Sequence, residues 1–376
     1  MPSEVFAISL RTNFRENLPQ KLARLFRSLN PEKIVAEQSI WAIKLHFGEA
    51  GSHAFIPPHF VRVFVDELKN LSAKAFLTDS NTLYVGARSN SVDHLEVALR
   101  HGFGYEVTGA PLVISDGLRG GTAAGIEVNS GGIKKAWIGA EFVAADGALV
   151  LSHFKGHELT GFGGALKNLG MGVAARRGKL DQHSDLRPKV VGKKCVGCGR
   201  CLRQCAHKAL KLTEDKKARI NPEKCVGCAS CIPACPQAAI AIPWENDAPK
   251  MMKKMVEYAK AALYGKGKRA MYVNFVTNVS PLCDCNNHSD APIVADIGVL
   301  ASCDPVALDT ASAELVNQAP GLSGSCLPEI GLPPGGDKWT ALHPDCNWRY
   351  QLEYAEEIGL GSQAYKLIWL AEPKGL

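Results

Sequence analysis

One cysteine pattern, present twice in the middle of the chain, constrains the fold more than any other feature. The stretch KKCVGCGRCLRQCAHKAL begins at residue 193, and EKCVGCASCIPACPQAAI begins thirty residues later, at residue 223. Each copy has the spacing C-x2-C-x2-C-x3-C. Eight of the 13 cysteines therefore lie in one short segment, and none precedes it. In a reducing compartment, cysteines spaced in this way ligate metal more often than they form disulfides.

The spacing predicts two [4Fe–4S] clusters with crossed ligands. The first three cysteines of each copy can wrap three corners of one cluster, while the fourth ligates the other cluster. The expected ligands are Cys195, Cys198, Cys201 and Cys235 for the first cluster, and Cys225, Cys228, Cys231 and Cys205 for the second. The alternative is two zinc knots, although zinc ribbons usually carry separated C-x2-C pairs. Residues 192–243 resemble the bacterial two-cluster ferredoxins.

The sequence on both sides of this segment alternates apolar runs with amphipathic patterns. Strands are expected at residues 5–10, 39–47, 73–79, 147–154, 269–276 and 291–300, and helices at 18–30, 91–103, 249–265 and 304–317. This alternation favours an α/β fold with a mixed, mostly parallel sheet and helices. We therefore expect a discontinuous α/β domain of residues 1–190 and 245–376. A two-cluster ferredoxin-like α+β domain would be inserted at residues 191–244.

Polar residues cluster where the expected strands end, which is where open α/β sheets bind ligands. The groups are Lys44, His46 and Glu49; Asp79, Ser80 and Asn81; and His153, Lys155, His157, Lys167 and Asn168 in a glycine-rich run. We expect Lys44, His46, Lys155, His157, Lys167 and Asn168 to converge on one pocket facing Cys283 and Cys285. Lysines beside glycine N–H groups favour a small anionic ligand. A metal pair on the H-x3-H spacing and a solvated loop are the alternatives.

The segment PLCDCNNHSDAP concentrates a second set of polar groups: Cys283, Asp284, Cys285 and His288. A Cys-x-Cys pair can chelate a soft metal but fills only two positions, so a second metal site would need a further ligand such as His46. A redox pair of thiols and two incidental cysteines are the alternatives. The remaining cysteines, Cys303, Cys326 and Cys346, show no ligand spacing. Asp296, Asp304 and Asp309 could support a site, although Asp304 is equally suited to cap a helix.

Four motifs carry a family resemblance: KLHFGE, LTDSNTLYVGARSNSVDHLEVALRHGF, SHFKGHELTGFGGALKNLGMG and CDCNNHSDAPIVADIGVLASCDPVALD. Over nearly its whole length the chain resembles the DUF362 iron–sulfur center proteins of anaerobic bacteria and archaea. The resemblance implies a fold and a cluster content. It implies no reaction, because the family is named for an unknown function.

The charge of the chain is concentrated in the cysteine segment. Between Leu186 and Lys224 there are twelve Lys or Arg and three acidic residues, whereas the whole chain has a net charge of +6. This local excess of nine positive charges predicts an acidic redox partner, such as a ferredoxin, a flavodoxin or a redox enzyme. A nucleic-acid partner is not expected, because no aromatic residue lies between Leu186 and Ile242 to stack on bases. The N-terminal residues resemble neither a signal peptide nor a membrane span, so we expect a cytoplasmic location.

Three functions fit these features. The first is electron transfer, in which two [4Fe–4S] clusters pass low-potential electrons to or from a partner or a ligand in the α/β domain. The second is an oxidoreductase, a ferredoxin-dependent reductase of a small anionic substrate with Lys155, His157 and Lys167 as catalytic residues. The third is a metal or cluster assembly factor that uses Cys283 and Cys285. We favour electron transfer, because the chain has no flavin or nicotinamide fingerprint.

Overall fold

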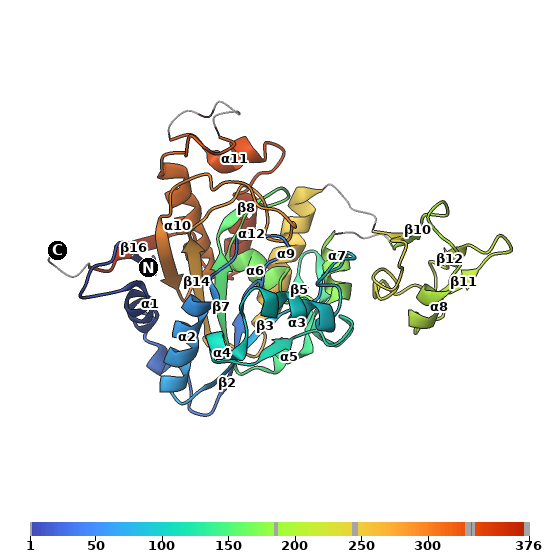
Figure 1. Ribbon diagram of the computed structural model, residues 1–376, viewed down its shortest axis with the longest axis horizontal. Coiled ribbons are helices and arrows are strands. Elements are labelled where there is room, and N and C mark those ends of the chain that lie inside the picture. The colour runs from blue at the N-terminus through green and yellow to red at the C-terminus, as the bar shows by residue number, and fades with distance from the viewer. Residues whose placement is uncertain (1, 184–186, 243–246, 328–331, 333–334, 372–376) are drawn as a thin grey trace.

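The computed structural model describes residues 2–183, 187–242, 247–327, 332 and 335–371. Its centre is an eight-stranded sheet with the strand order β16-β1-β15-β14-β7-β2-β3-β4 (Figure 1). The strands are β1 (Ser3–Ile8), β2 (Ile40–Lys44), β3 (Lys74–Asp79), β4 (Leu112–Ile114), β7 (Gly147–His153), β14 (Ala270–Val276), β15 (Gly298–Ser302) and β16 (Tyr365–Trp369). Five of the seven neighbouring pairs are parallel, and β15 is antiparallel to both of its neighbours. The expected mixed, mostly parallel α/β sheet is therefore confirmed.

Helices cover both faces of this sheet because the strand side chains alternate between the faces. In β7, Ala148 and Val150 belong to one apolar cluster, whereas Leu149 and Leu151 belong to the other. The first cluster includes residues of α6 (Ala165–Gly170), α9 (Ala248–Ala262), α10 (Pro305–Gln318) and α12 (Tyr350–Glu357). The second includes residues of α1 (Leu18–Arg27), α2 (Pro58–Asn70) and α3 (Ser91–Arg100). The sheet is thus buried on both sides, as its nearly continuous apolar strands require.

Shorter elements complete this part of the chain. The helical ones are the 3-10 turn η1 (Pro31–Lys33), α4 (Tyr105–Thr108), α5 (Ala140–Ala144), α7 (Arg176–His183) and α11 (Lys338–Leu342). Two antiparallel hairpins join β5 (Ala123–Ser130) to β6 (Ile133–Gly139) and β8 (Lys155–His157) to β9 (Gly161–Gly163). The β8–β9 hairpin occupies the glycine-rich run, so the H-x3-H pair is not helical.

One helix cap agrees with the expectation from sequence, and one strand differs from it. Asp304 caps α10, because its carboxylate accepts hydrogen bonds from the backbone N–H groups of Val306 and Ala307. The strand expected at residues 291–300 is wrong in its first half, since only Gly298–Ser302 forms a strand. Ile293 is nevertheless buried, and its N–H donates to the carbonyl of Val279 at 2.9 Å. The apolar run therefore reflects a buried loop.

The cysteine segment forms two small strand pairs beside the short helix α8 (Arg200–Gln204). β10 (Lys189–Val190) pairs with β13 (Ile240–Ala241), and β11 (Leu210–Leu212) pairs with β12 (Ala218–Ile220), both antiparallel. In Figure 1 these elements lie to one side of the main sheet. The division of the chain into two domains stays a prediction, and the boundary expected at residues 244–245 lies outside the described residues.

Candidate functional site

The eight clustered cysteines line two separate hollows. Cys195, Cys198, Cys201 and Cys235 line one hollow, and Cys205, Cys225, Cys228 and Cys231 line the other. In each hollow, the fourth cysteine of one motif lies with the first three of the other motif. This is the grouping that the spacing assigns to two crossed clusters, in which each iron takes one thiolate. Binding of iron itself stays a prediction.

The backbone around the two hollows repeats at the same offset of thirty residues. Gly197 and Gly227 have φ angles of +72° and +70°, and a Cβ on Gly197 would lie 2.3 Å from the carbonyl oxygen of Lys216. The N–H groups of Ala209 and Ala239 donate to the sulfurs of Cys205 and Cys235, each at 3.2 Å.

Backbone donors also reach the first cysteine of the motif. The N–H of Ala218 lies 3.3 Å from the sulfur of Cys195, and this donor together with that of Gly197 lowers the pKa of Cys195. N–H groups directed at sulfur favour the thiolate, which is the form that binds metal.

The two hollows have different surroundings. Cys198 is exposed to solvent. Cys228 instead interacts electrostatically with Arg176 of α7, and its neighbours Val226 and Gly227 share a groove with Leu180 of the same helix. Leu180 and Leu83 belong to the apolar cluster of the cysteine segment. The hollow of the second motif is therefore the one that faces α7.

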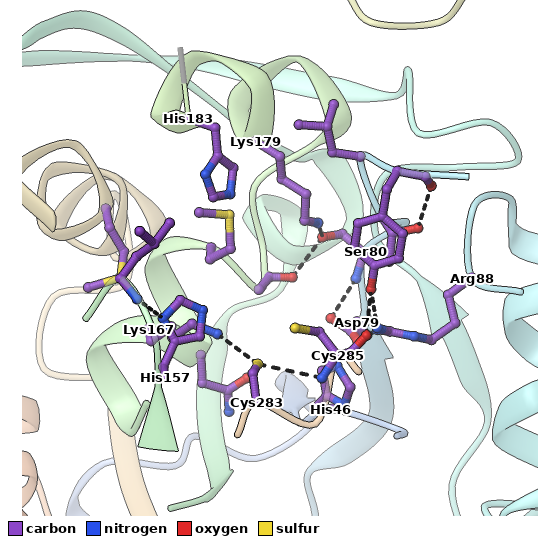
Figure 2. Close-up of a pocket in the computed structure, with 18 of the residues that line it drawn as sticks. His46, Asp79, Ser80, Arg88, His157, Lys167, Lys179, His183, Cys283 and Cys285 are labelled. Carbon is purple, nitrogen blue, oxygen red and sulfur yellow. Dashed lines mark hydrogen bonds and ion pairs between the residues drawn. The ribbon is translucent and has the colours of Figure 1, made fainter. Parts of the chain in front are cut away.

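A pocket of about 310 Å³ lies at the carboxyl ends of β2, β3 and β7 (Figure 2). Its volume is in the range of small-ligand sites. The lining includes Lys44, His46, Lys155, His157, Lys167, Asn168, Cys283 and Cys285. The predicted convergence of these residues is therefore confirmed, whereas their chemical roles stay predictions. His288 is exposed and is not among the lining residues.

One side of the pocket is a buried network of ion pairs. The ammonium of Lys44 lies 3.1 Å from a carboxylate oxygen of Asp79 and donates to the side-chain oxygen of Asn168 at 2.7 Å. Arg88 pairs with Glu49 at 3.0 Å, and its guanidinium donates to the hydroxyl of Tyr84 at 3.0 Å. Burial is the largest single influence and raises the pKa of Asp79, but Lys44, His94 and His46 together outweigh burial and place the net pKa well below the ordinary value. The carboxylate therefore stays ionised.

The Cys-x-Cys pair lies beside this network, because the hydroxyl of Tyr84 donates to the carbonyl of Cys285 at 3.1 Å. Figure 2 shows Lys167 and Cys283 directed toward each other, with Cys285 beside His46. The ammonium of Lys167 lies 3.3 Å from the sulfur of Cys283. The hydrogen bond from the Cys285 thiol and then the charges of Lys167 and Lys155 lower the pKa of Cys283, although burial opposes them. The pKa of Cys285 is raised by the same shared hydrogen bond. These effects favour a thiolate on Cys283 and a thiol on Cys285.

The residue between the two cysteines is itself fixed by ion pairs. Asp284 is buried, and its carboxylate lies 2.9 Å from Nδ1 of His153 and 3.2 Å from the ammonium of Lys155. Burial would raise the pKa of Asp284, but His153 and Lys155 lower it below the ordinary value. His153 thus supports the cysteine loop and is not among the pocket-lining residues.

Two histidines of the pocket are neutral and have defined tautomers. Nδ1 of His157 accepts a hydrogen bond from the N–H of Leu159 at 3.2 Å, and Nδ1 of His46 accepts one from the N–H of Gly48 at 2.9 Å. Burial, followed by nearby cations, places the pKa of each ring well below 6.5. Each neutral ring therefore carries its proton on Nε2, where it can act as a hydrogen-bond donor.

The three aspartates considered from sequence have structural roles. Asp309 is buried and accepts hydrogen bonds from the N–H groups of Ala165 and Leu166, at 2.7 and 2.9 Å, at the start of α6. It thereby positions the helix that carries Lys167. Asp304 caps α10, and Asp296 accepts a hydrogen bond from the N–H of Asn278 at 2.6 Å.

Sequence reasoning missed several polar residues of the pocket: Tyr84, Arg88, Lys179 and His183. Lys179, on α7, donates to the carbonyl oxygens of Asn81 and Ala174, each at 2.9 Å, and to the hydroxyl of Ser80. Burial lowers its pKa to about 8. These residues come from a loop and a helix with no ligand spacing, so no local signal marks them.

Within the described residues, no three His, Cys, Asp or Glu side chains are arranged to hold a single metal ion. The second metal site suggested for Cys283, Cys285 and His46 stays a prediction. It would need a ligand other than the His, Cys, Asp and Glu side chains of the described residues. In the same part of the chain, no helix is long and apolar enough to cross a membrane.

Comparison with known proteins identifies the family. The family model described as a domain of unknown function (DUF362) matches residues 42–314. The chain belongs to the DUF362 family. The matched residues of this DUF362 chain include those that line the pocket and those of the cysteine segment. The family model assigns no function to either. No curated protein matches the chain significantly.

Solved structures give weaker similarities. The lactate racemase apoprotein from Thermoanaerobacterium thermosaccharolyticum is 14% identical, with a TM-score of 0.36, over 73% of this chain and 51% of that one. A structural-genomics protein from Thermotoga maritima is 9% identical, with a TM-score of 0.41, over 80% of this chain and 58% of that one. The DUF362 chain thus spans little more than half the length of these proteins.

Proposed function

We propose that this DUF362 protein is an iron–sulfur electron-transfer protein that passes low-potential electrons between a redox partner and a ligand in the pocket. The observation that carries this proposal is the grouping of the eight cysteines into two sets of four, each completed by a cysteine of the other motif. Two [4Fe–4S] clusters held by these sets would supply one-electron transfer. The repeated N–H contacts to sulfur favour the thiolate form of the cysteines, which is the form that binds a cluster.

The surroundings of the two hollows support a direction for the electron path. Exposed Cys198 belongs to the first hollow, which is therefore the better docking point for a partner. The second hollow faces α7, and α7 contributes Lys179 and His183 to the pocket. The basic residues of the segment would favour an acidic partner, of the ferredoxin or flavodoxin type.

A reductase is the second candidate, because the pocket holds more chemistry than a carrier needs. Within the described residues, the Lys167 ammonium donates a hydrogen bond to the Cys283 sulfur alone, although an ammonium has three donors. Its remaining donors can therefore bind a small ligand. His157 presents a neutral Nε2–H to the same pocket and could donate a proton, with Lys155 and Lys167 binding the substrate.

Anaerobic purification followed by iron and sulfide analysis and EPR tests the proposal. We expect about eight irons per chain and EPR signals of two interacting clusters after reduction with dithionite. Cys205→Ala should damage the second cluster, which takes its other three ligands from the second motif. Cys303→Ala is the matched control and should retain the full iron content, because Cys303 lines neither hollow. Zinc in place of iron, or equal losses in both variants, would contradict the proposal.

A further inference from the structure

We propose that Cys283 and Cys285 form a redox-active pair that reduces a small-molecule disulfide bound in the pocket. The inference rests on the proposed function for the source of electrons, but the thiol chemistry can be tested by itself. Three features support it: two cysteines lie at the pocket wall, a lysine contacts one of them, and a turn brings the two residues close together.

The local backbone is suited to a disulfide between the two residues. The N–H of Asn286 donates to the carbonyl of Cys283 at 3.0 Å, which closes a turn with Asp284 and Cys285 at its centre. A turn shortens the distance between residues i and i+2 to the range that a disulfide can span. The N–H of Cys285 also lies 3.5 Å from the sulfur of Cys283. The ion pairs of Asp284 hold the turn in place.

The environment distinguishes the roles of the two cysteines. The ammonium of Lys167 lies 3.3 Å from the sulfur of Cys283, and an adjacent cation favours a thiolate, so Cys283 is the attacking nucleophile. Cys285 retains its proton and is the resolving thiol. Incidental cysteines in a core would be surrounded by apolar groups, and burial would then keep their thiols protonated.

The size and closure of the site define the substrate class. The Cys283 residue is 3% exposed and reaches solvent through a pocket of about 310 Å³. A disulfide within a folded protein cannot enter such a pocket, whereas a small, flexible disulfide can. Apolar side chains, including Leu159, Met171 and Met255, line part of the wall, and the Lys167 ammonium and the His157 Nε2–H can stabilise a departing thiolate.

The exchange half of the reaction balances without another reactant. The Cys283 thiolate attacks one sulfur of the substrate, the substrate S–S bond breaks, and one substrate thiolate leaves. Cys285 then attacks the mixed disulfide at the Cys283 sulfur and releases the second half of the substrate, which takes up the Cys285 proton. The products are the Cys283–Cys285 disulfide, one thiol and one thiolate. A low-potential one-electron donor then supplies two electrons, and uptake of one proton restores the thiolate and the thiol.

The test uses the anaerobic, cluster-containing protein and hydroxyethyl disulfide as the probe. Without reductant, we expect the peptide with Cys283 and Cys285 to lose both alkylatable thiols and two mercaptoethanol equivalents to be formed per chain, measured by mass spectrometry and thiol titration. Cys285→Ser should trap about one mercaptoethanol per chain as a mixed disulfide on Cys283. Cys303→Ser, outside the pocket, should behave as the wild type. A peptide that keeps two free thiols after excess probe, in protein with EPR-active clusters, would overturn the inference.

A second step separates this inference from the proposed function. After the probe is removed, dithionite should regenerate both thiols faster in the wild type than in Cys205→Ala, because the variant is expected to lack an intact second cluster. Formation of the disulfide supports the redox pair whatever this second step gives. Equal regeneration rates in the two proteins would instead contradict the electron path of the proposed function.

Discussion

Gly156 is the position where a single methyl group should disturb the pocket most directly. Gly156 lies in β8, and its N–H donates to the carbonyl of Ser280 at 2.8 Å. A Cβ at this position would lie 2.0 Å from the carbonyl oxygen of Pro281, whereas ordinary contacts begin at 3.4 Å. Gly156→Ala therefore requires the Pro281 carbonyl to move by about 1.4 Å. Cys283 follows Pro281 by two residues, so this shift should also separate its sulfur from Lys167.

The loss of folding stability expected for Gly156→Ala has two parts. Overpacking a buried site costs roughly 1–3 kcal/mol, and loss of the buried hydrogen bond to Ser280 costs roughly 1–3 kcal/mol more. We expect a combined loss of about 2–6 kcal/mol, which for a chain of this size lowers the apparent Tm by roughly 3–8 °C. Anaerobic calorimetry measures the Tm. The rate at which iodoacetamide alkylates Cys283 at neutral pH reports the fraction of this cysteine that is ionised. That rate should fall.

Gly121→Ala is the matched control, because a Cβ at Gly121 would meet no atom within 4 Å and its φ lies outside the left-handed region. It should leave the Tm and the alkylation rate unchanged or raise the Tm slightly. A Gly156→Ala protein with the same Tm and the same Cys283 reactivity as this control would refute the argument that close packing of β8 holds the cysteine loop.

Three further predictions address charge. Lys167→Met should move the pH midpoint of Cys283 alkylation upward, because the variant loses an adjacent cation that lowers the pKa of Cys283; an unchanged midpoint would exclude the contact. Burial raises the pKa of Asp116 to about 6. The folded state therefore binds more protons than the unfolded state between about pH 4 and pH 6. The free energy of unfolding should fall by up to about 3 kcal/mol as the pH rises through this window. Urea unfolding from pH 4 to pH 7 should show a smaller fall for Asp116→Asn, and equal slopes would contradict the assignment. Reduction of the protein by an acidic ferredoxin or flavodoxin should slow as ionic strength rises, because screening weakens attraction to the basic segment; a rate independent of salt would exclude steering.

The features that were predictable from the sequence depend on short spacings or on general properties of sheets. The eight cysteines could be assigned to two sets because ligands within each motif are at most a few residues apart. The pocket could be predicted because Lys44 ends β2 and Asp79 ends β3, and the carboxyl ends of parallel strands meet at one edge.

The features that were not predictable depend on tertiary contacts. Arg88 reaches the pocket from a loop and Lys179 from α7, and neither has a spacing relation to the other lining residues. The apolar run at 291–300 predicts one strand, although only Gly298–Ser302 forms it, because buried loops and buried strands have the same composition. The contact between Lys167 and Cys283 joins residues 116 positions apart, so only the fold brings them together.

The charges of the pocket connect the proposed redox pair to the kind of ligand that it would bind. In the reduced state, Lys44 pairs with Asp79, Lys155 with Asp284, and Lys167 with the Cys283 sulfur. Lys179 donates hydrogen bonds to neutral oxygens, and within the described residues no carboxylate lies within 4 Å of it.

A Cys283–Cys285 disulfide would remove the negative charge beside Lys167, so the oxidised pocket would hold two buried ammonium groups, those of Lys167 and Lys179, without an adjacent anion. Because burial makes such charges costly, the oxidised state should bind an anionic ligand more tightly than the reduced state does. The anionic ligand inferred from the lysines and the disulfide chemistry inferred from the cysteines are therefore compatible, and the order of events follows: thiolate product should be retained until electrons restore Cys283.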